Sequence, residues 1–370
     1  MTAPGATARL AFDVFCQVID NYGDAGVCWR LARQLASRGY AVRLWIDRLS
    51  TLAQLVPALD VRLSGQRVDS VHVGSWAEAC QAMPPRHGVV LEAFGCTLPV
   101  PYQARIVTQD SLWVNLEYLS AETWTARCHG LPSPQASGAI KYFYFPGFTP
   151  ASGGLLRESG LLARRDRAHR QDRRQRLHAL TGLDTSELTP QTRCVLLFAY
   201  PQAPMASLQA ALSQQAEPVW LLVPGGTPQG LHDEGSLRVH AIPFVPQARF
   251  DEVLWCCDLN FVRGEDSLVR AIWAARPLVW QLYPQTDQAH LAKLRAWLDI
   301  LPLTPEATQL QNAWNGRHPG ELVEAVRQAL RPAAWQAWQL QAQRHCKALA
   351  AQDDLVTRLL AFCVQHRETR

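Results

Sequence analysis

Nearly continuous apolar segments alternate with helical stretches along most of this chain, and this alternation limits its fold more than any other feature. "FDVFCQVI" (12–19) and "AVRLWID" (41–47) flank "GVCWRLARQLASRG", in which apolar residues recur every four positions from Val27 to Leu35 and Gly39 fits a helix end. The order strand, helix, strand predicts a βαβ unit.

Further segments of the same kind follow in two series. The first continues with the apolar runs 88–94, 112–119 and 141–148. The second begins at "RCVLLFAYP" and continues through "PVWLLVPGG", "LRVHAIPF", "DLNFVRG" and "RPLVWQLYP", with helical stretches between them. Apolar strands separated by helices are typical of parallel sheets with both faces covered. The sequence therefore predicts the α/β class with two sheets.

Length and composition also favour two domains, because 370 residues with 48% hydrophobic content exceed one core of usual size. We expect an N-terminal domain over 1–154, an Arg-rich linker over 155–190 and a C-terminal domain over 191–349. A helix at about 350–370 is expected to pack back on the first domain.

The sequence shows no signal for a membrane, an export route or a metal site. It lacks the roughly 20 consecutive apolar residues of a membrane span, and "MTAPGATARLAFDVFC" lacks a signal-peptide layout. The ten cysteines show neither CxxC pairs nor zinc-site spacing. We expect a cytoplasmic protein with reduced cysteines.

Arginine is concentrated in residues 157–176, although the net charge of the whole chain is only +4. One interpretation is a solvated helix face or a mobile linker with internal charge pairs. The other is a contact surface for an acidic partner. Both remain open from the sequence.

Two acids stand in the loop of "VIDNYGDAGVCWR" (18–30), between a predicted strand and a predicted helix. The loop is neither a dinucleotide fingerprint nor a P-loop, since it lacks the third glycine and the Lys-Ser/Thr pair. Helix capping is one explanation for Asp24, but it does not explain Asp20. A carboxylate at the carboxyl end of a strand can act as a base or bind a cation.

The segment "FVRGEDSLVRA" (261–271) is again strand, turn and helix. Asp266 or Ser267 would cap the helix, whose first N–H groups form an anion site beside Arg263. The alternative is an ordinary capped helix in which Arg263 pairs with Glu265. We prefer the first interpretation, in which this turn binds a phosphate group. "LYPQTDQAHL" (282–291), with its acid and amides, is a weaker polar signal nearby in sequence.

Aromatic residues follow two strands of the second series. Phe198 and Tyr200 come after "RCVLL", and Gln247 and Phe250 lie in "PFVPQARFDEV". Aromatic faces beside an amide can hold a nucleobase, whereas core packing is the alternative for each ring.

Several long strings in this chain resemble the protein-arginine rhamnosyltransferase family that modifies translation elongation factor P, the EarP family. They are "IDNYGDAGVCWRLARQL", "YFYFPGFTPASGGLLRE", "FAYPQ", "PFVPQARFD" and "FVRGEDSLVRAIWAARPLVWQLYPQTDQAH", and the resemblance extends from about residue 12 to the C-terminus. It implies a GT-B glycosyltransferase, in which two Rossmann-like domains have parallel sheets facing across a cleft. The N-terminal domain is then expected to bind the acceptor, and the C-terminal domain the nucleotide-sugar.

The resemblance implies inverting transfer of L-rhamnose from dTDP-β-L-rhamnose to one arginine guanidinium of elongation factor P. It places the proposed general base at Asp24, with Asp20 beside it, and a second essential carboxylate at Glu265. The expected donor-binding residues share the strand-end loops: Asn21, Tyr22, Gly23, Phe198, Tyr200, Gln247, Phe250, Arg263, Gly264, Asp266 and Ser267. Neither a metal nor another cofactor is expected, since no DxD motif lies near a predicted strand end. Which of Asp20 and Asp24 takes the proton stays open.

Other functions remain as alternatives. A GT-B transferase or nucleotide-sugar epimerase with another acceptor would share the second-domain motifs without needing the "DNYGD" string. A non-enzymatic nucleic-acid-binding protein would use residues 157–176 and would not need Glu265. We expect no direct binding of nucleic acid and no contact with a membrane.

Overall fold

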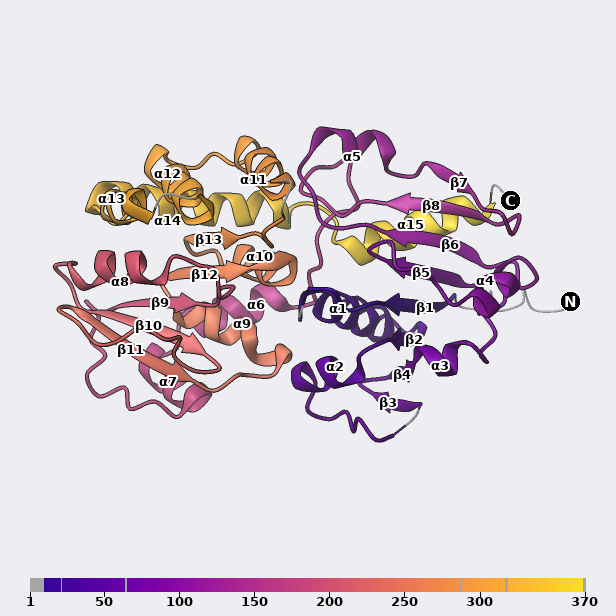
Figure 1. Cartoon of the computed structure of the whole chain (residues 1–370), viewed down its shortest axis with the longest axis horizontal. Helices are drawn as coiled ribbons and strands as arrows, with labels where there is room; N and C mark the ends of the chain where they lie inside the picture. Colours follow the sequence, from indigo (N-terminus) through magenta and orange to yellow (C-terminus); the bar gives the residue numbers. More distant parts are fainter. Residues whose placement is uncertain (1–9, 21, 64, 286–287, 317–318, 369–370) are drawn as a thin grey trace, which may run out of the picture. The chain divides into compact units, whose positions relative to one another are not determined.

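A computed structural model describes residues 10–20, 22–63, 65–285, 288–316 and 319–368. The chain divides into two compact units (Figure 1). Unit 1 combines Met1–Leu156 with Asp353–Arg370, and unit 2 is Arg157–Gln352. Both are α/β units with largely parallel sheets, which confirms the predicted class.

Unit 1 contains a sheet in the order β3-β4-β2-β1-β5-β6-β8-β7. All neighbours are parallel except the two edge pairs, β3 with β4 and β7 with β8. The strands are β1 (Ala11–Cys16), β2 (Ala41–Ile46), β3 (Gln66–Val68), β4 (Val71–Ser75), β5 (Val89–Ala93), β6 (Leu112–Leu116), β7 (Pro132–Pro134) and β8 (Ile140–Tyr144).

Alternate residues along these strands point into two different cores, as strand geometry requires. Val14 of β1 joins one core with side chains of α1, α2 and α15, whereas its neighbour Phe15 joins another that includes Tyr102 of α4. The helices of unit 1 are α1 (Gly23–Ser37), α2 (Leu49–Leu55), α3 (Trp76–Ala79), α4 (Val100–Ile106), α5 (Thr123–Cys128) and α15 (Leu355–Glu368).

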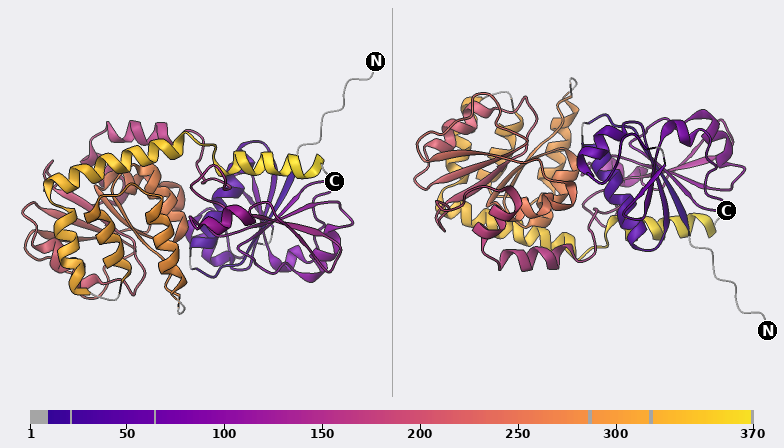
Figure 2. Two further views of the ribbon diagram at one scale, coloured as in Figure 1. Left: turned by 90° about the horizontal axis from the view of Figure 1, so that it is seen from above. Right: turned by 90° about the horizontal axis from the view of Figure 1, so that it is seen from below.

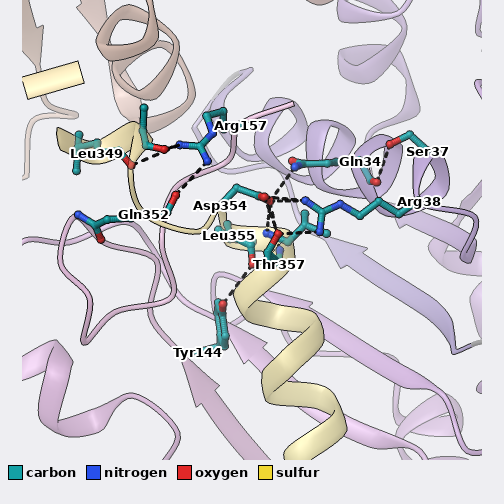
Figure 3. Close-up of polar contacts among 12 residues, drawn as sticks. Gln34, Ser37, Arg38, Tyr144, Arg157, Leu349, Gln352, Asp354, Leu355 and Thr357 are labelled. Atoms are coloured by element: carbon teal, nitrogen blue, oxygen red, sulfur yellow. Dashed lines mark hydrogen bonds and ion pairs between the residues drawn. The ribbon is translucent and has the colours of Figure 1, made fainter. Parts of the chain in front are cut away.

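Asp354 fixes the start of α15 within unit 1. Its Oδ1 accepts hydrogen bonds from the backbone N–H groups of Val356 and Thr357 at 3.0 and 3.2 Å, which caps the helix. The same carboxylate binds Gln34 of α1 and Arg38, directly after that helix, at 2.7 to 2.9 Å (Figure 3). These contacts hold the end of the chain against α1.

Unit 2 contains a fully parallel sheet in the order β11-β10-β9-β12-β13. In chain order this is 3-2-1-4-5, a doubly wound arrangement with helices on both sides of the sheet (Figure 2). The strands are β9 (Arg193–Leu197), β10 (Val219–Pro224), β11 (Leu237–Ile242), β12 (Leu259–Arg263) and β13 (Leu278–Gln281).

One face of this sheet packs against α8, α12 and α13 in a core that also includes Trp338 of α14. The helices of unit 2 are α6 (Leu161–His169), α7 (Arg173–Thr181), α8 (Met205–Ser213), α9 (Gln247–Cys256), α10 (Gly264–Ala274), α11 (Ala289–Asp299), α12 (Pro305–Asn315), α13 (Pro319–Ala329) and α14 (Pro332–Ala350).

The Arg-rich segment is not a separate linker, because it forms α6 and α7 within unit 2. Its guanidinium groups bind carbonyl oxygens of that unit. Arg157 donates to the carbonyls of Leu349 and Gln352 (Figure 3), and Arg173 donates to Thr192 and pairs with Asp258 at 2.8 Å. A guanidinium has five donors in a planar fork and so can satisfy several backbone acceptors at once. These arginines therefore stabilise unit 2.

The ten cysteines are free thiols, and most are buried. No helix in the described part of the chain has both the length and the apolar character needed to cross a membrane.

Candidate functional site

In each unit most of the expected site residues lie near the carboxyl ends of central strands. In unit 2, β9 lies between β10 and β12, so the connections after β9 and β12 leave in opposite directions. In unit 1, β1 has the same place between β2 and β5. Such switch points are where doubly wound sheets bind their ligands. Most of the predicted residues follow β1, β9 and β12, whereas Gln247 and Phe250 lie in α9, which follows the edge strand β11.

Asp24 does not cap its own helix. It lies in the first turn of α1, yet its Oδ2 accepts hydrogen bonds from the backbone N–H groups of Ile19 and Asp20 in the preceding loop, at 2.7 and 2.8 Å. The N-cap position, Tyr22, has no side-chain cap hydrogen bond. Asp24 thus closes the loop after β1 through one carboxylate oxygen. Its Oδ1 accepts a long hydrogen bond of 3.4 Å from the hydroxyl of Tyr118.

The electrostatic environment makes Asp24 a stronger proton acceptor than an exposed aspartate, because its pKa is raised. Burial, with 2% of the residue exposed, raises the pKa of Asp24, and the negative charge of Asp20 adds to this. The N–H bonds from Ile19 and Asp20 oppose the rise. A carboxylate with a raised pKa is a better base than an ordinary one.

The rest of this loop is tightly packed. A Cβ added to Gly23 would lie 2.7 Å from Oδ2 of Asp20, so only glycine fits there without moving that carboxylate. The hydroxyl of Tyr22 donates to Oε1 of Gln54 at 2.5 Å, which directs this side chain to α2. Asn21 lies outside the described residues.

Tyr118 lies beside Asp24 and Phe94 lies against Tyr118, and neither was predicted as a site residue. Their rings stack with centroids 4.5 Å apart and planes 14° apart. Phe94 follows β5, which pairs with β1, and Tyr118 comes after β6, the next strand beyond β5. Tyr118 falls inside the apolar run 112–119 predicted as a strand, whereas β6 ends at Leu116. That shorter strand leaves Tyr118 in the strand-end loop.

In unit 2, Arg263 lies between the two predicted aromatic residues. Its guanidinium carbon is 4.5 Å from the ring centroid of Phe198 and 4.9 Å from that of Tyr200. Its Nη1 donates to the carbonyl of Ala199 at 2.9 Å. The ring of Phe250 lies 5.3 Å from that of Phe198. The structure thus brings together four of the expected donor-binding residues.

Asp266 and Ser267 were predicted to cap α10, but the helix begins at Gly264, so both residues lie inside its first turn. The N-cap position is Arg263, which makes no side-chain cap hydrogen bond, and Gly264 follows with φ of 63°. Ser267 bonds back to the carbonyl of Arg263, inside the first turn. The first-turn N–H groups are therefore not capped by Asp266 or Ser267, and a capping anion suits them.

Asp266 instead joins α10 to α9. Its Oδ2 accepts hydrogen bonds from Gln247 at 3.0 Å and from Arg270 at 3.1 Å, and Arg270 also pairs with Asp251 at 2.8 Å. Gln247 and Arg270 are buried, with 5% and 2% of each residue exposed. A buried, hydrogen-bonded ion network fixes the relative position of the two helices.

Glu265 forms a salt bridge with Lys293 of α11, and Lys293 was not predicted as a site residue. Lys293 lies in α11, two residues after the polar string "LYPQTDQAHL". That string was the nearby sequence feature that indicated a site in this region. Asp287 of that string lies outside the described residues, and Gln288 occupies the N-cap position of α11. Tyr283 of the same string packs edge-on against Tyr200, with centroids 5.4 Å apart.

Among the residues that the structure describes, no three His, Cys, Asp or Glu side chains cluster closely enough to hold a metal ion. Metal-independent chemistry remains a prediction from the sequence.

Two doubly wound α/β units with strand-end loops of this kind define a GT-B glycosyltransferase fold. CalG4, the calicheamicin glycosyltransferase, has the same fold, with a TM-score of 0.51 at 15% identity over 96% of this chain and 99% of that one. The chain belongs to the family described as elongation factor P (EF-P) rhamnosyltransferase EarP, whose family model matches residues 12–364.

Individual relatives agree with this family. The protein-arginine rhamnosyltransferase of Pseudomonas putida KT2440 is 42% identical over 96% of this chain and 98% of its own length. A solved structure concerned with EarP-mediated arginine glycosylation of translation elongation factor EF-P is 33% identical, with a TM-score of 0.61, over 95% of this chain and 98% of that one. The chain is thus an enzyme of the glycosyltransferase class.

Proposed function

We propose that this protein transfers L-rhamnose from dTDP-β-L-rhamnose to the guanidinium of one arginine of elongation factor P, with inversion at the anomeric carbon. The observation that carries this proposal is the family match along residues 12–364. The residues that bear the family's motifs also lie at the strand-end loops of both units.

Unit 2 suits the nucleotide-sugar. The guanidinium of Arg263 and the N-terminus of α10 provide positive charge for a diphosphate, and this charge would stabilise the departing dTDP. The rings of Phe198 and Phe250 offer aromatic surface for the thymine ring, whereas Tyr200, with 2% of the residue exposed, packs against the guanidinium of Arg263. Glu265, held by Lys293, would fix the sugar.

Unit 1 suits the acceptor arginine. An arginine side chain has a pKa of roughly 12 or more, so a carboxylate cannot deprotonate it before it attacks. Asp24, with Asp20 beside it, would bind the guanidinium and weaken its delocalisation. A nitrogen lone pair then attacks C1 of the sugar as the bond from C1 to the diphosphate oxygen breaks. The proton leaves that nitrogen for Asp24 only as the C–N bond forms, and the diphosphate departs with the electron pair.

The test is incubation of purified protein with dTDP-β-L-rhamnose and elongation factor P, followed by intact-mass measurement of the acceptor. The expected result is a gain of one deoxyhexosyl group. UDP-N-acetylglucosamine in place of dTDP-rhamnose is the control, because its conversion with no change to the acceptor would favour an epimerase. Unmodified acceptor with intact dTDP-rhamnose would refute the proposal.

The cytoplasmic location expected from the sequence accompanies this proposal, since elongation factor P would have to meet the enzyme there.

A further inference from the structure

The first turn of α10 contains two carboxylates, although this helix end is proposed to bind a diphosphate. Glu265 and Asp266 come directly after Arg263 and Gly264. The N–H groups of a helix N-terminus attract an anion, whereas a fixed carboxylate in the same turn repels it. The turn can therefore bind a diphosphate well only if cations from outside it offset these two carboxylates.

Each of the two carboxylates has a cationic partner. Asp266 accepts from Nε of Arg270, one turn later on α10, at 3.1 Å. Arg270 also pairs with Asp251 of α9 at 2.8 Å, so its single charge is shared between two acids. Glu265 pairs with Nζ of Lys293, which belongs to α11. Lys293 thus supplies a second positive charge, placed beside Glu265.

Trp280 of β13 holds the start of α10 and the helix of Lys293 in one relative position. Its indole N–H donates to the carbonyl of Gly264, the residue before Glu265, at 2.7 Å. Its ring packs edge-on against Trp297 of α11, with centroids 5.3 Å apart and planes 75° apart, and both tryptophans are buried. Lys293 precedes Trp297 by four residues, so the two side chains lie on the same face of α11.

The pair of Glu265 and Lys293 is partly open to solvent, with 16% and 22% of the side chains exposed. A partly exposed ion pair contributes little to the free energy of folding. The same charges act directly on an anion bound at the helix end. Loss of Lys293 should therefore disturb the binding of an anion much more than the fold.

We propose that Lys293 is a positioning residue for the nucleotide-sugar and that it acts through Glu265. By pairing with this carboxylate, Lys293 offsets the repulsion between Glu265 and the diphosphate and fixes the direction of the Glu265 side chain. The positive charge of Arg263 and of the helix N-terminus then remains available to the diphosphate. This inference rests on the proposed function and concerns the binding of its donor.

The experiment is calorimetric titration with dTDP-β-L-rhamnose of the unmodified protein, Lys293→Met, Glu265→Gln and the variant that carries both changes. Lys293→Met leaves the charge of Glu265 without this partner, so the Kd should rise about 3- to 30-fold. Glu265→Gln removes that charge, so adding Lys293→Met to it should leave the Kd within about 2-fold of Glu265→Gln alone. Lys293→Arg keeps the positive charge and should stay within about 3-fold of the unmodified protein. Lys347→Met, which changes an exposed lysine of α14, is the control and should leave the Kd unchanged.

The outcomes separate this inference from the function beneath it. Neither binding of dTDP-rhamnose nor transfer by the unmodified protein would refute the function. If the unmodified protein binds the donor, an unchanged Kd in Lys293→Met would overturn the inference alone. An equal rise in the Kd with Glu265 and with Gln at that position would also overturn it, because Lys293 would then act on the donor without Glu265. Weaker binding by Glu265→Gln alone would contradict it too, since Glu265 would then attract the donor. If Lys293→Met does not fold, Lys293→Gln is a second neutral variant and carries the same expectation.

Discussion

Replacing Asp24 by Asn removes the proposed proton acceptor with almost no change in shape. The Asn oxygen can still accept the N–H groups of Ile19 and Asp20, which hold the loop at 2.7 and 2.8 Å. Its amide nitrogen then takes the place of Oδ1, the oxygen that the Tyr118 hydroxyl reaches. A neutral amide cannot take a proton from the acceptor. General-base catalysis contributes about 10²- to 10⁴-fold, or about 3 to 5 kcal/mol of the barrier, so kcat should fall by that factor.

The effect on stability should be much smaller. Two hydrogen bonds to a charged oxygen become bonds to a neutral one, a loss of about 1 kcal/mol each. Removing a buried charge offsets part of that loss, because burial already disfavours the ionised form of Asp24. We therefore expect a small shift of the unfolding midpoint, and unchanged binding of dTDP-rhamnose by calorimetry.

Asp47→Asn is the matched control. Asp47 holds the same loop through the N–H of Val18 at 2.9 Å, but its side chain is not an expected catalytic group. Its variant should keep turnover close to that of the unmodified protein. If Asp24→Asn also kept near-normal turnover, the assignment of Asp24 as the base would be wrong.

The pH dependence of activity is a second test of the role of Asp24. Asp24 must be ionised to accept a proton, and its pKa is raised above the ordinary value of 3.8. Activity should therefore fall as the pH drops through this raised pKa, at a higher pH than for an exposed aspartate. The effect on stability has the opposite sign. Since the folded state holds this proton more tightly than the unfolded one, the cost of the buried charge grows as the pH rises from the unfolded pKa through the folded one.

Three further substitutions test the other parts of the site. Glu265→Gln should abolish most transfer while dTDP-rhamnose still binds, and a loss of donor binding in calorimetry would instead make Glu265 a nucleotide-binding group. Arg263→Ala should weaken dTDP binding about 10- to 100-fold through loss of charged contacts to the diphosphate. Its control is Arg249→Ala, which removes only a surface pair with Glu252 at 3.6 Å, and equal effects of the two would contradict the diphosphate assignment. Gly23→Ala places a Cβ 2.7 Å from Oδ2 of Asp20, so kcat should fall about 10-fold with donor binding retained; an unchanged kcat would mean that the position of Asp20 does not matter.

The central strands could be predicted from the sequence because buried parallel strands consist almost entirely of apolar residues. The predicted run 41–47 extends one residue beyond the end of β2, and the run 88–94 extends one residue beyond each end of β5. The edge strand β3, "QRV", was missed because it has one apolar residue, and β7, "PSP", because proline is unusual in strands and tolerated only at edges.

For the site, the sequence identified residues next to strand ends but not their contacts. Asp20 and Arg263 come directly after apolar residues and Asp24 lies in the same short loop as Asp20, so all three could be identified from the sequence. The pairs Phe94 with Tyr118, and Glu265 with Lys293, depend on which elements become neighbours in the fold. The role of the Arg-rich segment could not be predicted from the sequence, because its arginines bind backbone carbonyls, and every residue type has a backbone carbonyl.

The most direct test of the central claim is to locate and characterise the sugar on the product. Fragmentation mass spectrometry of the treated elongation factor P, with NMR of the modified peptide, identifies both the residue and the anomeric configuration. The account predicts a single rhamnose on one arginine side-chain nitrogen in the α configuration. A β-linked sugar, or a sugar on a residue other than arginine, would contradict it.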